Sequence, residues 1–384
     1  FGAGLLEESC QSIFFARAAA ELRRGGKSGH RVKLVHAGPV FDLSAHNADE
    51  WIPIVPATNG ALALGISHVI VRDKLHDQDF IAKSTIGFDA PAPGSSGPSY
   101  RQFLEAFTPE KVSEITGVPA ATVVRVAREF ASDERPFAFL DERSLSFSNA
   151  WGTTLAVLGL NALVGAIERS SGGIRFAPTA PYIDWPAVEP DDAARAGLTH
   201  ARLDGAGSEL YPLAQSVHET IPEKLNANAE ARPEVALLFH ANPCYARHQP
   251  ERWTKALRKI PFIVSFSPYR DESVEAIADL VLPDHSFLER WEDAGAAPGI
   301  ARAVAGVRSP AIEPLYDTRQ TGDVLISVAR TLGGGVSRAF PWANFREAMS
   351  ARLIGLHQAQ RGTIVETSSR AFFKRLYEDG YWAE

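Results

Sequence analysis

Apolar and polar positions alternate along the chain in blocks that predict a succession of strands and helices. Short apolar runs of strand length are separated by longer stretches with helical periodicity. One helix start is marked by Thr108, which precedes Pro109 and an early acid, and Pro119 opens the next helix. An apolar run at 136–140 predicts a strand, and the long apolar stretch after it predicts a buried helix ending near Gly172-Gly173. This alternation is typical of an α/β fold with a parallel sheet.

The same pattern occurs twice. A strand opening at Val32 is followed 16 residues later by Ala48-Asp49, and a strand opening at Phe262 is followed 16 residues later by Ala278-Asp279. A helix precedes the first strand of each copy, and an apolar strand ending in proline follows each aspartate. Two such copies predict two pseudo-symmetric, doubly wound parallel-sheet lobes of the Rossmann-like, dinucleotide-binding type. We expect the two aspartates to be structural caps rather than catalytic groups.

The repeat divides the chain into four predicted parts. The first lobe is expected over residues 1–173 and the second over residues 235–339. Between them, residues 174–234 are rich in proline, aspartate, alanine and glycine with weak periodicity, which predicts an excursion between the lobes. Residues 340–384 are expected to form a helical C-terminal cap.

Composition excludes several classes of function. The 384 residues are 45% hydrophobic, as in globular proteins, and carry a net charge of −7 with acidic and basic residues mixed along the chain. This balance argues against nucleic acid or an anionic membrane surface as a partner. The longest apolar stretch, 156–167, is shorter than the roughly 20 residues that a membrane helix needs, so no direct membrane span is expected.

Cysteine content and the first residue limit the interpretation further. Only Cys10 and Cys244 are present, whereas an iron–sulfur or zinc site needs about four ligands, so no iron–sulfur cluster is expected within this sequence. The sequence begins with Phe1, and its only methionine is Met349. We therefore expect it to be an internal piece of a longer protein.

Loop residues directly after predicted strands are the candidates for binding a ligand. In a doubly wound sheet the ligand lies beyond the carboxyl ends of the strands, near helix N-termini that favour phosphate. The first-lobe candidates are glycines that let backbone approach a ligand, and a turn where a helix begins: Gly2, Gly4, Gly38, Pro56, Thr58 and Asn59. The second-lobe candidates are polar or turn-forming residues: Asn242, Pro243, Glu272 and Ser273.

Each candidate also has a plainer interpretation. The glycines can serve ordinary turns, and Thr58-Asn59 can be a helix N-cap. The acidic stretch around Asp284 and Glu289 indicates surface polarity more than acid–base or metal chemistry. No Ser-His-Asp order, metal-binding histidine pair or P-loop is present in the sequence, so we assign no catalytic and no metal-ligating residue.

Together the ordered motifs resemble the middle portion of the molybdopterin oxidoreductase family, in the dimethyl sulfoxide reductase superfamily. The motifs that carry the resemblance are spread over nearly the whole chain: 1–7, 48–56, 161–165 with 172–173, 241–243, 271–273, 278–283 and 288–290. Residues 310–323 resemble the polysulfide- and thiosulfate-reductase-like branch, which includes the molybdopterin-like subunits of menaquinone reductase and alternative complex III.

The resemblance implies a cofactor and partners. It implies bis(molybdopterin guanine dinucleotide) with molybdenum or tungsten, one dinucleotide in each lobe, and Glu7 joins the loop candidates as a cofactor-binding residue. Family members transfer electrons in respiratory complexes with an iron–sulfur electron-transfer subunit and a membrane quinone-reactive subunit. The branch also implies a periplasmic location. The metal ligand and the iron–sulfur cysteines would lie outside this sequence.

The sequence departs from the family pattern in the first lobe. An Asp-Pro-Arg motif is replaced by Gly38-Pro39-Val40, and a Pro-Gly-Thr-Asp motif by residues 56–59, where the last residue is an amide. Losing that carboxylate costs on the order of 1–3 kcal/mol of binding. Where a glycine-rich turn is expected, Asp141-Glu142-Arg143 would repel a pyrophosphate unless Arg143 compensates. A second hypothesis therefore stays open: a metal-free scaffold or electron-relay subunit of a membrane quinone reductase complex.

Overall fold

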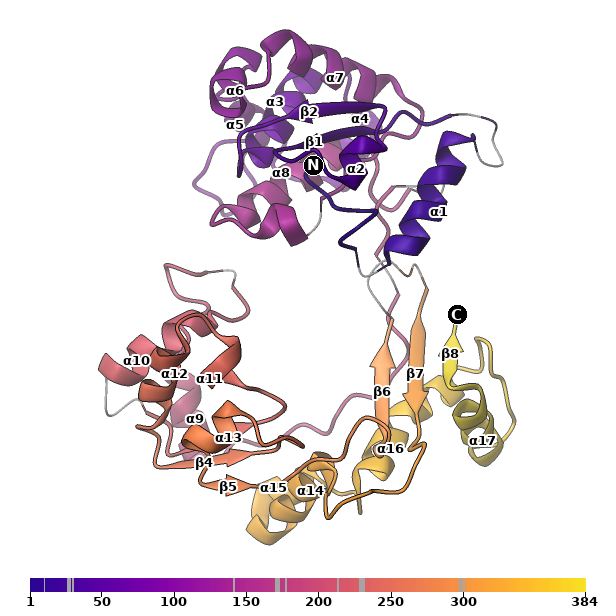
Figure 1. Cartoon of the computed structure of the whole chain (residues 1–384). Helices are drawn as coiled ribbons and strands as arrows, with labels where there is room; N and C mark the ends of the chain where they lie inside the picture. The colour runs from indigo at the N-terminus through magenta and orange to yellow at the C-terminus, as the bar shows by residue number, and fades with distance from the viewer. Residues whose placement is uncertain are drawn as a thin grey trace. The chain divides into compact units, whose positions relative to one another are not determined.

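The computed structural model describes residues 1–384 except 10, 26–28, 30, 141, 170–172, 177, 213, 228–231, 297–299 and 301. The chain forms two compact units, Phe1–Phe176 and Ala177–Glu384 (Figure 1). The predicted α/β class with parallel sheets is confirmed, since both units contain parallel strands joined by helical crossovers.

The first unit contains a parallel strand pair. Strand β1 (Val35–Gly38) pairs with β2 (Glu50–Pro53), and the crossover between them contains the short helix α2 (Leu43–His46). The opening segment runs beside β1, because the Gly2 N–H donates to the Ala37 carbonyl at 2.6 Å. The glycine-containing opening and the end of β1 are therefore neighbours.

Helices supply most of the core of the first unit. They are α3 (Asn59–Arg72), α4 (Gln78–Ser84), α5 (Tyr100–Leu104), α6 (Pro109–Thr116), α7 (Ala120–Ser132) and α8 (Ala150–Leu163). Helix α1 (Ser12–Arg23) and the 3₁₀ helix η2 (Glu142–Leu145) place no apolar side chain in this core among the described residues. Helix α3 packs against α6, α7 and α8, and its Leu62, Ile66 and Ile70 are buried (Figure 1). The predicted helix starts at Thr108 and Pro119 are confirmed, and the Thr108 hydroxyl caps α6 by accepting from the Lys111 N–H.

Three boundaries in the first unit were predicted wrongly. The strand expected to open at Val32 begins at Val35. No strand is assigned at 136–140, where the Asn161 side chain takes the place of a partner strand and bonds both the N–H and the carbonyl of Ala138 at 2.8 Å. The long helix ends at Leu163, because the chain turns at Gly165 with a φ of 62°; Gly172 lies outside the described residues.

The second unit contains a three-stranded parallel sheet. Strands β3 (Val235–Leu238), β4 (Phe262–Ser265) and β5 (Leu280–Val281) are ordered β3-β4-β5, with α11 (Pro243–Ala246), α12 (Pro250–Leu257) and α13 (Glu272–Ile277) in the connections. Trp253 of α12 and Ile263 of β4 are buried in one core with Leu225. Leu225 belongs to α10 (Ile221–Ala227), so part of the predicted excursion packs on this sheet; α9 (Asp192–Thr199) and η3 (His218–Thr220) precede it.

An antiparallel sheet, which the sequence did not predict, completes the second unit. Its strands are β6 (Glu292–Gly295), β7 (Val304–Arg308) and β8 (Tyr381–Ala383). The helices of this region are α14 (Thr321–Leu332), α15 (Gly334–Ala339), α16 (Phe345–Gln358) and α17 (Ser369–Asp379). Trp382 of β8 is fully buried with Leu353 and Phe372. The C-terminal segment thus contributes a strand as well as the expected helices.

The predicted internal repeat has a clear structural basis. The Asp49 carboxylate accepts from the Leu34 N–H at 2.9 Å, and the Asp49 N–H donates to the Leu34 carbonyl at 2.8 Å. Asp279 makes the same two bonds with Ile263, at 2.8 and 2.9 Å. Both aspartates therefore join the end of a crossover to the preceding strand, as structural caps do. Leu34 and Ile263 are equivalent, so the second crossover is one residue longer than the first, and the equal spacing counted from Val32 and Phe262 is off by one.

Candidate functional site

The second unit brings its four predicted ligand-binding residues together after β3 and β4. Asn242 Oδ1 accepts from the Ser273 hydroxyl at 2.7 Å and from the Ser273 N–H at 3.1 Å, while Asn242 Nδ2 donates to Glu272 Oε2 at 2.6 Å. Ser273 is fully buried and Glu272 is exposed. Pro243 opens α11 and is buried. The amide is thus fixed in orientation, and the carboxylate beside it faces solvent.

A buried cluster that the sequence did not predict holds the start of the loop that carries Asn242. We define the Asp284 cluster as Asp284, His240, Arg290 and the N–H of Thr321. Asp284 is 1% exposed; its Oδ2 lies 2.8 Å from both His240 Nε2 and Arg290 Nη1, and its Oδ1 accepts from Thr321 at 2.7 Å. His240 has a φ of 47°, an unfavourable conformation for a non-glycine residue. The cluster therefore fixes the strained turn that leads to Asn242.

The expectation that this acidic stretch lies on a polar surface is wrong for two residues. Asp284 is buried as described, and Glu289 is only 7% exposed. Glu289 accepts from the N–H groups of Leu315 and Ser286, both at 2.8 Å, and these bonds hold its pKa below the usual value. Both carboxylates fix loops, and the apolar strand and proline before Asp284 are the sequence signal that its position is near the core.

The first unit also brings its predicted glycines together, but the space beside each is filled. A β-carbon placed on Gly2 would lie 2.8 Å from Ser144 Oγ, and one on Gly38 would lie 2.7 Å from His36 Nε2. On Gly4 it would collide with the guanidinium of Arg143. The three glycines lie near one another as predicted. The space beside each of them is occupied by a side chain of the same chain and not left open for a ligand.

Arg143 is surrounded by carboxylates. It donates to Asp42 at 2.8 Å, to Glu8 at 2.7 Å and to Glu7 at 3.2 Å. We define these four residues as the Arg143 cluster; Glu7 also accepts from the Ser44 hydroxyl at 2.7 Å. Burial disfavours the charged guanidinium, but Glu8 and Asp42 outweigh that effect and raise the pKa of Arg143. Glu7, predicted to bind cofactor, is here an ion-pair partner of Arg143.

The remaining first-unit candidates lie at the start of α3. Thr58 occupies the N-cap position, but its hydroxyl donates to the Val55 carbonyl at 2.6 Å and forms no side-chain cap. Asn59 is 3% exposed, and its Oδ1 has no hydrogen-bond partner among the described residues. Pro56 is exposed in the preceding turn. His36 Nε2 is also buried and forms no hydrogen bond with the part of the chain that the structure describes. Burial lowers the pKa of this imidazole, against the effect of Asp42.

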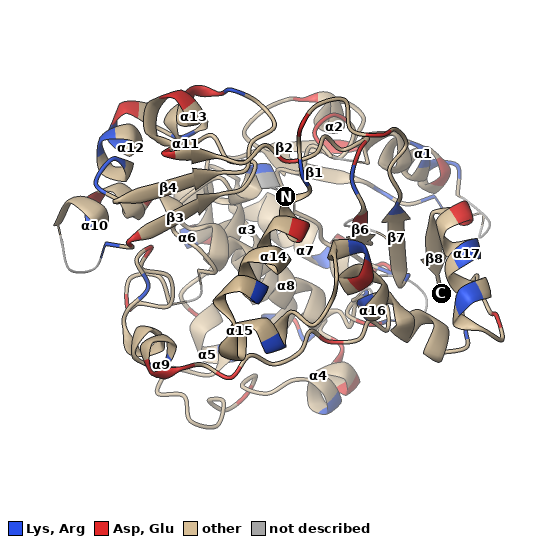
Figure 2. Ribbon diagram, turned by 90° about the horizontal axis from the view of Figure 1, so that it is seen from below, with Lys and Arg blue, Asp and Glu red and all other residues tan. Residues whose placement is uncertain are grey.

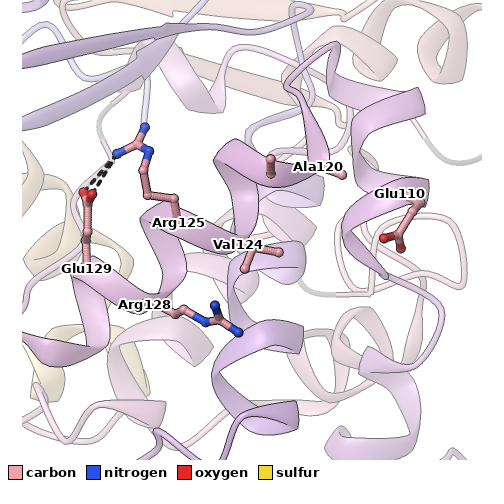
Figure 3. Close-up of a pocket in the computed structure, with 7 residues that line it drawn as sticks. Glu110, Ala120, Val124, Arg125, Arg128 and Glu129 are labelled. Carbon is pink, nitrogen blue, oxygen red and sulfur yellow. Dashed lines mark hydrogen bonds and ion pairs between the residues drawn. The ribbon is translucent and has the colours of Figure 1, made fainter.

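A surface hollow on the first unit lies away from these residues. It has a volume of about 540 Å³ and is lined by residues of α6 and α7: Glu110, Ala120, Ala121, Val124, Arg125, Arg128 and Glu129 (Figure 3). Arg125 pairs with Glu129 at 3.0 Å and with Glu50, and Arg128 pairs with Asp73 at 2.8 Å. Carboxylates therefore neutralise part of the positive charge that the two arginines bring to the hollow.

Neither a group of side chains that could hold a metal ion nor a membrane-spanning helix is present in the described part of the chain. Within it, no group of three or more histidine, cysteine, aspartate or glutamate side chains is arranged to hold a metal ion. No helix among the described residues has the length and apolarity to cross a bilayer. Acidic and basic residues are interspersed over both units (Figure 2).

Parallel strands joined by helical crossovers, with polar loops beyond the carboxyl ends of the strands, define an α/β protein of the kind that binds ligands at that edge of its sheets. The molybdopterin oxidoreductase family model matches residues 8–330, and the chain belongs to this family. The resemblance predicted from the motifs is thereby confirmed. Membership implies a molybdopterin cofactor with molybdenum or tungsten.

Individual relatives support the predicted branch. The chain is 29% identical over 322 residues to the menaquinone reductase, molybdopterin-binding-like subunit, of Nitratidesulfovibrio vulgaris, covering 83% of this chain and 40% of the relative. It is 28% identical to the molybdopterin-containing subunit of arsenate respiratory reductase from Chrysiogenes arsenatis (75% and 36% covered). It is 26% identical to that of thiosulfate reductase from Salmonella typhimurium (85% and 42% covered). The chain thus spans about two fifths of the length of these relatives.

A solved structure supports the fold. Acetylene hydratase from Pelobacter acetylenicus matches with a TM-score of 0.65 and 21% identity, over 89% of this chain and 48% of that one. At this identity the likeness shows the fold alone.

Proposed function

We propose that this chain is the central part of the large subunit of a respiratory complex, where it binds molybdopterin guanine dinucleotide and takes part in electron transfer. The arrangement of Asn242, Ser273 and Glu272 at the carboxyl end of the second sheet carries the proposal. The exposed Glu272 carboxylate accepts one bond from Asn242 and keeps further acceptor capacity. Such a carboxylate matches the N–H donors of a guanine edge, so these residues fit the nucleotide end of the cofactor. The bound metal would supply the two-electron redox chemistry.

The partners follow from the kind of complex. We propose that an iron–sulfur subunit exchanges electrons with this subunit and that a membrane subunit connects the complex to quinone. The printed name of the Nitratidesulfovibrio relative, a menaquinone reductase subunit, supports this assignment. A periplasmic location is part of the same proposal.

Metal and nucleotide analysis of the purified protein tests this function. Molybdenum or tungsten is measured by elemental analysis, and guanosine monophosphate is measured after acid release. We expect metal and nucleotide in stoichiometric amounts. A Glu272→Ala variant should lose bound nucleotide, whereas a matched Glu275→Ala variant, on the same helix, should keep it. A protein without metal and without nucleotide contradicts the proposal.

A second candidate function is a metal-free scaffold or electron-relay subunit of a membrane quinone reductase complex. The specific observation in its favour is the Arg143 cluster, which sets three carboxylates around one guanidinium where an anionic cofactor is expected. Under this hypothesis the purified complex contains neither metal nor nucleotide and still reduces quinone. Loss of quinone reduction on deleting the subunit, with other subunits assembled, would indicate a relay; loss of assembly would indicate a scaffold.

A further inference from the structure

The ligand side of the first unit is closed by side chains of the same chain. Beside Gly2 lie Ser144 and Asn59, and beside Gly38 lies His36. Beside Gly4 lies the Arg143 guanidinium. In a dinucleotide site, glycines of this kind leave room for the ligand backbone to approach. Here a ligand would have to displace groups from all three positions.

Charge at this place also opposes a dinucleotide. The Arg143 cluster contains one positive and three negative groups, a net charge of −2. The side chain of Asp42 is only 11% exposed, so its charge is weakly screened by water. Burial lowers the pKa of the neighbouring His36, which disfavours a compensating positive charge on this imidazole. A pyrophosphate would therefore approach like charges, and the only cation of the cluster is already shared among carboxylates.

Arg143 joins three segments that are far apart in the sequence. Its partners Glu7 and Glu8 belong to the opening loop, and Asp42 caps α2 by accepting from the Ala45 N–H at 2.7 Å. Arg143 itself lies in η2. One side chain thus bridges the opening loop, the β1–β2 crossover and the turn before α8.

We infer that the first unit holds no dinucleotide, and that Arg143 is a structural residue which closes the ligand side of this unit. The inference deepens the proposed function and rests on it, since it limits the protein to one nucleotide, held by the second unit. The paired cofactor, bis(molybdopterin guanine dinucleotide), would need a site in both units.

Nucleotide counting gives the first test. Guanosine monophosphate is released by acid from the purified protein and from its Arg143→Ala variant. We expect no more than one nucleotide per chain, and the same amount in the variant. Two nucleotides per chain, or a lower amount in Arg143→Ala than in the native protein, would overturn the inference while leaving the proposed function intact.

Thermal unfolding gives the second test and holds whether or not nucleotide is bound. Arg143→Ala leaves three carboxylates without their shared cation, and we expect the midpoint of the first unit's transition to fall by about 4–8 °C. The control is Arg101→Ala, which removes an exposed guanidinium that pairs with the exposed Asp89 at 2.7 Å and lies over the Phe88 ring. That change should shift the midpoint by less than about 2 °C.

A rescue experiment shows whether the stability lost in Arg143→Ala comes from the unpaired carboxylates or from a general disturbance of the fold. Adding Glu7→Gln and Asp42→Asn to Arg143→Ala removes two of the three unpaired charges and should restore at least half of the lost midpoint. If Arg143→Ala does not fold, Arg143→Lys, which keeps one charge, should fold with an intermediate midpoint. An Arg143→Ala midpoint no lower than that of Arg101→Ala would contradict the structural role. If native protein contains neither nucleotide nor metal, the proposed function fails and these midpoints alone decide the inference.

Discussion

The two units share one pattern of aspartate-to-backbone hydrogen bonds and differ in the loops beyond the carboxyl ends of their parallel strands. Asp49 and Asp279 join crossover to strand through the same pair of hydrogen bonds. Beyond the strands, the first unit has the Arg143 cluster with a net charge of −2, whereas the second has Asn242 fixed by Ser273, with the exposed Glu272 beside it. The two units thus show that the same strand geometry can carry loops that differ in charge and in packing.

The largest effect is expected when the Asp284 cluster is broken. Asp284→Ala leaves Arg290 and His240 without their shared, buried carboxylate and removes the acceptor for the Thr321 N–H. We expect the free energy of unfolding of the second unit to fall by about 3 kcal/mol, measured by urea denaturation. The exposed Asp317 is the control, and Asp317→Ala should change it by less than about 0.5 kcal/mol. Equal effects of the two changes would show that Asp284 does not support the ligand loop.

The next largest effect is expected when Asp49 or Asp279 is replaced, and this pair of changes tests how similar the two units are. Asp49→Ala and Asp279→Ala each remove an acceptor from a strand N–H, at 2.9 and 2.8 Å. We expect each change to lower the stability of its own unit by about 1–2 kcal/mol. Urea denaturation measures the stability of each variant. Hydrogen exchange of the Leu34 and Ile263 amides shows whether the loss falls in the first or the second unit. A large effect in one unit and none in the other would break the proposed structural repeat.

Acid sensitivity sharpens the same comparison for the first unit. The N–H of Leu34 is the main cause of a pKa of Asp49 below its usual 3.8. Because the folded-state pKa is the lower one, Asp49 stabilises the fold above pH 3.8 and loses this contribution as the pH falls through the folded-state pKa. The unfolding midpoint of Asp49→Asn should therefore fall less steeply than that of the native protein between about pH 5 and pH 3. Parallel curves would contradict the assigned hydrogen bond.

The smallest effect is expected at the surface hollow of α7. Arg125 is 42% exposed and pairs with Glu50 and Glu129 on the surface. Arg125→Ala should lower stability by less than about 1 kcal/mol, since exposed ion pairs contribute little, and should leave the nucleotide content unchanged. A loss of nucleotide in this variant would move the binding site from the loops to the hollow.

Local signals in the sequence predicted more than distant contacts did. Helix starts at Thr108 and Pro119 and the repeated aspartates depend on neighbouring residues, and the structure confirms the helix starts. The partners of Arg143 lie 136, 135 and 101 residues away, so no local pattern could assign them. Strand β8 was missed for the same reason, since it is short and pairs with the distant β7.

The predicted cofactor residues divide in the same way. Asn242, Pro243, Glu272 and Ser273 follow strands that the apolar pattern located, and the fold brings them together. Around Gly2, Gly4 and Gly38 the pattern gave the backbone correctly, but the side chains that fill the space come from other segments, such as Ser144 of η2. Their role in binding cofactor stays a prediction.

A cryo-EM map of the purified protein with its natural partners tests the central claim most directly. The account predicts nucleotide density against Glu272 and Asn242 in the second unit. In the first unit it predicts no ligand density, with the Arg143 guanidinium still in contact with Asp42. A dinucleotide whose phosphates lie beside Gly4, with Arg143 turned towards them and away from its carboxylates, would contradict it.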